Sequence, residues 1–101
     1  MFIYNVTIKV RDPIKTEWLT WLKEEHIPRV MESNCFTGVT IMRLLEVDDS
    51  EGPTFAVQYQ AESKALYNRY IEQFAGQLRQ ESFDKWGDQF IAFRSLMQVV
   101  N

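Results

Sequence analysis

The pattern of hydrophobic and polar positions begins with a period of two over residues 2–10, which is typical of a β-strand with one buried face. From residue 13 to about residue 27, or to residue 32 with a last turn, apolar positions recur at helical spacing on one arc. That arc carries Trp18, Leu19, Leu22, His26 and Val30. The only histidine therefore faces the core side of a helix beside Pro28, where proline stops or kinks a helix.

The remaining pattern predicts two strands, a second helix and a last strand. Strands over 36–47 and 54–61 flank an Asp/Ser/Gly/Pro turn at 48–53 and so form a hairpin. Ser63 caps the second helix, which Gly76 weakens or ends. Residues 77–86 are helical again up to a cap at Gly87, and the last strand spans 89–100.

The resulting order is βαββαβ, which predicts one domain over residues 1–101 with a ferredoxin-like α+β fold. The expected sheet is antiparallel, has four strands and carries both helices on one face. The last strand is apolar on both sides, with Ile91, Phe93, Met97 and Val99 on one and Phe90, Ala92, Leu96 and Val100 on the other. Because an uncovered apolar face is costly in a monomer, we expect a homodimer paired through its sheets.

Composition narrows the class of protein. Hydrophobic residues make up 46% and charged residues 25%, as in a globular protein, and the net charge of −3 comes without a basic cluster that would suit nucleic acid. One cysteine fits a reducing compartment. The N-terminus does not resemble a signal peptide, and no apolar stretch reaches the ~20 residues that span a bilayer. We expect a cytoplasmic protein with no membrane or nucleic-acid partner.

His26 is the first candidate for chemistry, because imidazole titrates near neutral pH and can relay a proton or bind a metal. The residues leave three roles open. In the first, His26 is structural and forms a hydrogen bond with a free carbonyl or a nearby glutamate. In the second it belongs to a ligand pocket, and in the third it binds a metal or haem. A zinc site is not expected, because only His26 and Cys35 offer nitrogen or sulfur ligands. Cys35 is expected to be buried and unreactive.

Two arginines lie inside predicted strands, Arg43 and Arg94. They form ion pairs across a dimer, or they hold an anionic or carbonyl-bearing ligand. The candidate aromatic wall of a pocket consists of Trp18, Trp21, Tyr59, Tyr70 and Phe74. Together these residues predict binding of a small apolar or aromatic molecule between sheet and helices, in a cavity of a few hundred Å³ that touches His26. The alternative is a non-catalytic structural or regulatory dimer with a filled core.

Several segments carry a resemblance to known proteins: IYNVTIKV, EWLTWLKEEHIPRVM, RLLEVDDSEGPTFAVQY and FDKWGDQFIAFRSLMQVV. Over nearly the whole chain they resemble a small uncharacterised bacterial family known as a domain of unknown function. The helix that ends in EHIP is also similar to the dimeric α/β-barrel superfamily. That superfamily includes antibiotic-biosynthesis monooxygenases, muconolactone-isomerase-like proteins and stress-responsive barrel proteins. The resemblance implies a closed barrel of two sheets with helices outside.

The superfamily resemblance adds an enzymatic alternative. It implies a cofactor-independent monooxygenase- or isomerase-like protein in which His26 is the general base and an arginine or tyrosine stabilises an oxyanion. Some barrel relatives hold haem with one histidine. Here Glu24 and Glu25 would crowd the haem propionates beside His26, and a histidine at a helix end would be poorly fixed as a ligand. We therefore expect no haem, no metal and no other cofactor.

Overall fold

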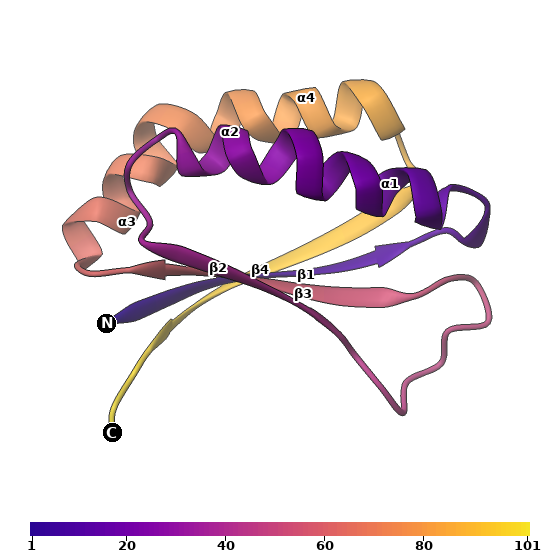
Figure 1. Cartoon of the computed structure of the whole chain (residues 1–101), viewed down its shortest axis with the longest axis horizontal. Helices are drawn as coiled ribbons and strands as arrows, with labels where there is room; N and C mark the ends of the chain where they lie inside the picture. Colours follow the sequence, from indigo (N-terminus) through magenta and orange to yellow (C-terminus); the bar gives the residue numbers. More distant parts are fainter.

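The computed structural model describes residues 1–101 and contains a four-stranded sheet whose helices all lie on one face (Figure 1). The strands are β1 (Phe2–Val10), β2 (Gly38–Arg43), β3 (Thr54–Ala61) and β4 (Phe90–Gln98). Their order across the sheet is β2-β3-β1-β4, and every neighbouring pair is antiparallel. This arrangement confirms the ferredoxin-like α+β fold predicted from the sequence.

Two helical segments cover the sheet, and a π turn interrupts each of them. The first comprises the 3₁₀ turn η1 (Asp12–Ile14), α1 (Lys15–Trp21), the π turn η2 (Leu22–His26) and α2 (Ile27–Met31). The second comprises α3 (Lys64–Tyr70), the π turn η3 (Ile71–Ala75) and α4 (Gly76–Trp86). None of these helices is both long enough and apolar enough to cross a membrane.

The π turns explain why neither Pro28 nor Gly76 ends its helix. In the first turn the N–H of Ile27 donates to the carbonyl of Leu22, five residues back. Pro28 then falls in the first turn of α2, where a missing N–H is tolerated. Gly76 begins α4 directly after the second π turn. Its cost in a helix, about 1 kcal/mol, is offset by the burial of its neighbours Ala75 and Leu78.

The other predicted boundaries were largely confirmed, with one correction. The Ser63 hydroxyl accepts a hydrogen bond from the N–H of Leu66 at 3.2 Å, and Gly87 has the expected positive φ of 58°. The strand predicted over 36–47 is shorter, because β2 ends at Arg43. Beyond it the chain turns away from β3, and Glu46 adopts a left-handed backbone with a φ of 60° that cannot continue a strand.

The two faces of the sheet differ in what covers them. Toward the helices, β1 and β3 bury Tyr4, Ile8, Val10, Phe55, Val57 and Tyr59. No helix covers the opposite face (Figure 1), where Ile91, Phe93 and Met97 of β4 are 58%, 69% and 41% exposed. The prediction that β4 is apolar on both sides is therefore confirmed, and one of its sides is uncovered in the single chain.

Candidate functional site

His26 lies at the end of the first π turn, on the side of the helix that faces the sheet. Its imidazole stacks on the indole of Trp21, with ring centroids 4.8 Å apart. Burial is the main cause that lowers the pKa of His26 from 6.5 to about 4. The positive charges of Arg29 and Arg94 lower this pKa further, while Glu81 opposes them. His26 is therefore a neutral imidazole at pH 7.

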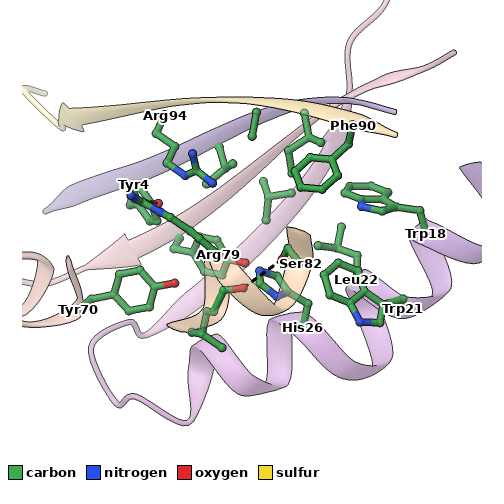
Figure 2. A pocket seen from close by; sticks show the side chains of 16 residues that line it. Tyr4, Trp18, Trp21, Leu22, His26, Tyr70, Arg79, Ser82, Phe90 and Arg94 are labelled. Atoms are coloured by element: carbon green, nitrogen blue, oxygen red, sulfur yellow. Dashed lines mark hydrogen bonds between the residues drawn. The ribbon is translucent and has the colours of Figure 1, made fainter. Parts of the chain in front are cut away.

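A cavity of about 50 Å³ lies between the sheet and the helices, and His26 is part of its wall (Figure 2). Strands β1, β3 and β4 form its floor, the first helical segment forms one side and α4 the other. Most of its lining is apolar: Val6, Ile8, Trp18, Trp21, Leu22, Val57, Leu78, Phe90 and Ala92. The polar groups are few: Tyr4, His26, Tyr59, Tyr70, Arg79, Ser82 and Arg94.

The tyrosines belong to an aromatic cluster at one end of the cavity. Tyr4 packs against Tyr59 and Tyr70 with ring centroids 5.9 and 5.7 Å apart, and Phe36 and Tyr67 also pack against it. Burial raises the pKa of Tyr59 and of Tyr70 well above the usual value of 10.0. Both hydroxyl groups therefore stay protonated across the physiological range and can donate hydrogen bonds.

Two arginines reach this site, Arg94 from β4 and Arg79 from α4 (Figure 2). A guanidinium nitrogen of Arg79 donates to the hydroxyl oxygen of Tyr4 at 3.1 Å. The charge of Arg94 acts on both His26 and Tyr70. Sequence reasoning missed Arg79, because its neighbours along α4 are mostly polar. The available signal was its position beside buried Leu78 and three residues before Ser82, both of which face the cavity.

The structure brings together most, but not all, of the predicted site. Trp18, Trp21, His26, Tyr59, Tyr70 and Arg94 all line the cavity. Arg43 does not, because it lies at the end of β2 and pairs with Asp49 of the exposed turn at 3.1 Å. Phe74 does not either, since it lies in a separate depression beside Arg29 and Leu78. The structure therefore separates Phe74 from the predicted aromatic wall and Arg43 from the predicted ligand contacts.

A second, open groove touches the other side of His26. It has a volume of about 480 Å³ and a largely charged lining that includes Glu24, Glu25, Glu32 and Lys85. Arg29 of α2 and Glu81 of α4 form an ion pair of 2.8 Å that joins the two helical segments in this groove. His26 and Trp21 thus separate an apolar inner cavity from a polar outer groove.

The side chains give little support to a metal-ion site or to a reactive thiol. No group of three or more histidine, cysteine, aspartate and glutamate residues lies close enough together to hold a metal ion. Cys35 is 1% exposed and free, which confirms the expected buried thiol.

Comparison with solved structures shows the same fold in proteins of low identity. A dimeric ferredoxin-like protein from an uncultured marine organism has a TM-score of 0.77 at 13% identity, covering 99% of this chain and 95% of its own. A variant of MhuD with two manganese protoporphyrin IX bound per active site has a TM-score of 0.70 at 16% identity, with coverage of 100% and 96%.

A third similar structure is a variant of SnoaB, a cofactor-independent oxygenase from Streptomyces nogalater, with a TM-score of 0.65 at 12% identity and coverage of 99% and 94%. No curated protein sequence matches the chain. Residues 1–100 match the family described as domain of unknown function (DUF4286). That match spans nearly the whole sequence and includes every residue of the cavity, so the chain belongs to the DUF4286 family.

Proposed function

We propose that this protein is a single-domain cytoplasmic homodimer that binds a small apolar or aromatic molecule in the cavity between its sheet and helices. One observation carries the proposal: an imidazole and two guanidinium groups from three separate elements converge on a lining that is mostly apolar. His26 comes from the first π turn, Arg79 from α4 and Arg94 from β4. A few polar groups in an apolar pocket are typical of small-molecule sites, because they orient a ligand that burial holds.

The small volume of the cavity limits the size of the ligand that it can hold. At about 50 Å³ it holds only a few water molecules, far below the few hundred Å³ expected from the sequence. A ligand therefore enters by displacing side chains at the rim, of which Arg79 and Arg94 are exposed. The small volume also favours the competing proposal, a structural or regulatory dimer with a filled core.

The uncovered face of the sheet supports the proposed dimer. Its large exposed side chains include Met42, Ile91, Phe93 and Met97. An apolar patch of this kind on a sheet is stabilised when a second copy covers it by sheet-to-sheet packing. The similarity to a protein described as a dimeric ferredoxin-like protein supports a second copy as the occupant.

A catalytic role is the second candidate. A neutral imidazole is in the protonation state of a general base, and Tyr70 and Arg94 offer hydrogen-bond donors for a developing oxyanion. The fold shared with the cofactor-independent oxygenase SnoaB supports testing it. With a turnover assay for an identified substrate, His26→Ala should lower the rate by about 10²-fold or more if His26 is the base. An unchanged rate would remove this mechanism.

A porphyrin does not fit the cavity. About 50 Å³ is well short of the roughly 300–1,000 Å³ of cofactor and ligand pockets, and the aromatic cluster beside Tyr4 closes one end. We therefore assign no haem-dependent step to His26.

Native mass spectrometry of freshly purified protein tests the binding proposal, because it reports the mass of the assembly and of any retained molecule together. Ala92→Leu supplies the matched variant, since residue 92 lines the cavity and a larger side chain there fills it. Ala65→Leu on the exposed surface of α3 is the control. We expect a bound small molecule that Ala92→Leu removes and Ala65→Leu keeps. Protein without added mass, together with no response of the His26 NMR signals to small aromatic compounds, would favour the filled core.

A further inference from the structure

The two arginines at the cavity, Arg79 and Arg94, form no ion pair; Arg11 and Arg69 form none either, but they do not line this cavity. Arg29 and Arg43 each form an ion pair, with Glu81 at 2.8 Å and with Asp49 at 3.1 Å. Neither Arg79 nor Arg94 has a carboxylate oxygen within the 4.0 Å limit of an ion pair. The chain carries 14 acidic and 11 basic residues, so this absence does not reflect a shortage of acids.

Both guanidinium groups act on the same tyrosine of the cavity wall. Both Arg79 and Arg94 lower the pKa of Tyr70, whose hydroxyl group lines the same cavity. Arg79 is held by its hydrogen bond to Tyr4, which leaves the hydroxyl hydrogen of Tyr4 free to donate to another group. Figure 2 shows both arginines extending over the same end of the cavity as Tyr4.

The guanidinium groups of Arg79 and Arg94 and the hydroxyl groups of Tyr4 and Tyr70 all offer hydrogen-bond donors, and none of them is a carboxylate. A guanidinium group presents parallel N–H bonds that match the two oxygens of a carboxylate, and charge-assisted hydrogen bonds of this kind are the strong ones. Beyond the arginines the lining becomes apolar at Trp18, Leu22 and Phe90. The cavity is therefore basic at one end and apolar at the other.

We propose that Arg79, Arg94 and the Tyr4 hydroxyl bind the carboxylate of a small ligand whose compact apolar or aromatic body enters the cavity. This inference rests on the proposed ligand-binding function and names its substrate class: monocarboxylates rather than neutral or cationic aromatic compounds. A carboxylate at this place occupies the position that an acidic side chain takes beside Arg29 and Arg43. The neutral imidazole of His26 then faces the body of the ligand rather than its charge.

The test compares acids with their own amides, which share the same ring and lack the charge. Benzoate and phenylacetate, with benzamide and phenylacetamide, are titrated into the full-length protein at pH 7 and followed by NMR and calorimetry. The variants are Arg79→Gln and Arg94→Gln. Arg69→Gln on exposed α3, which has no ion pair and does not line the cavity, is the matched control.

We expect each acid to bind at least about 10-fold more tightly than its amide, since a hydrogen bond to a charged group is roughly twice as strong as one between neutral groups. Arg79→Gln and Arg94→Gln should each remove most of this preference, and Arg69→Gln should not change it. Amides that bind as tightly as acids would overturn the carboxylate site and leave the ligand-binding function standing. Failure of acids and amides alike to bind, with no molecule retained in native mass spectrometry, would contradict both. Thermal unfolding of each variant shows whether a loss of binding comes from a loss of folding.

Discussion

The imidazole of His26 lies nearly parallel to the indole of Trp21, with centroids 4.8 Å apart and planes inclined by 26°. The two residues are five positions apart, which in a regular α-helix places them about 140° apart around the axis. The π turn over Leu22–His26 brings the two rings together. This contact removes the imidazole from water on one face, and it is part of the burial that keeps His26 neutral.

Stability should therefore depend on pH through His26. The folded chain has a pKa of about 4 at this residue, and the unfolded chain has the usual 6.5. Between these values the unfolded chain binds a proton that the folded chain does not, so the free energy of unfolding falls as pH is lowered from about 6.5 toward 4. The full loss is up to about 3 kcal/mol. Urea unfolding measured from pH 7 to pH 5 checks the slope.

His26→Gln is the control for that slope, because glutamine is polar and does not titrate. It should flatten the pH dependence between pH 7 and 5, and an NMR titration of the wild-type imidazole should have its midpoint near 4. A wild-type midpoint near 6.5 would contradict the burial argument.

The strands and the sides they bury could be predicted because their physical causes are local. The alternation over residues 2–10 placed Tyr4 and Ile8 on one side of β1. Ser63 was expected to cap the second helix, and its hydroxyl accepts a hydrogen bond from the N–H of Leu66. The π turns could not be predicted, because a helix of 3.6 residues per turn was assumed throughout. Pro28 was consequently expected to stop or kink its helix and Gly76 to weaken or end its own, whereas the structure continues as a helix through both.

The candidate site was predictable in most of its aromatic part and at His26, but in only some of its charged residues. Large apolar residues at helical spacing face the core, so Trp18 and Tyr70 were found from the pattern. Charged residues follow no such rule. Arg43 and Arg94 both lie in strands on the helix-facing side, yet only Arg94 reaches the cavity, since Arg43 pairs with a loop acid. Arg79 depends on the packing of α4 over β1, which no local pattern encodes.

Cofactor content is the next prediction. Freshly purified protein should show no Soret band and no stoichiometric iron or zinc. The cavity is too small for a porphyrin, and no three histidine, cysteine, aspartate or glutamate side chains lie close enough together to bind a metal ion. Absorption spectroscopy and metal analysis of the untagged protein measure both. A Soret band that disappears in His26→Ala would show that the cavity opens far wider than its present volume.

Core packing around the cavity should respond strongly to truncation. Leu22 is 1% exposed and lines the cavity, so Leu22→Ala should lower the free energy of unfolding by about 2–5 kcal/mol. Leu45 is 77% exposed, and Leu45→Ala should change it by less than about 0.5 kcal/mol. Denaturant unfolding of both variants at one pH gives the comparison. Equal effects at the two sites would mean that Leu22 is not part of a packed core.

Substitution of two exposed phenylalanines on different surfaces tests whether the chain forms a homodimer through its sheet. Phe93 lies on the uncovered face of the sheet, in β4, and is 69% exposed, whereas Phe83 lies on α4 and is 58% exposed. If a second copy packs on the sheet, Phe93→Glu places two charges in that interface, one from each copy, and burying an unpaired charge is strongly unfavourable. Light scattering should then give twice the chain mass of 12.0 kDa for the wild type and for Phe83→Glu, and the single-chain mass for Phe93→Glu. A wild-type particle of 12.0 kDa at all micromolar concentrations would rule out the homodimer.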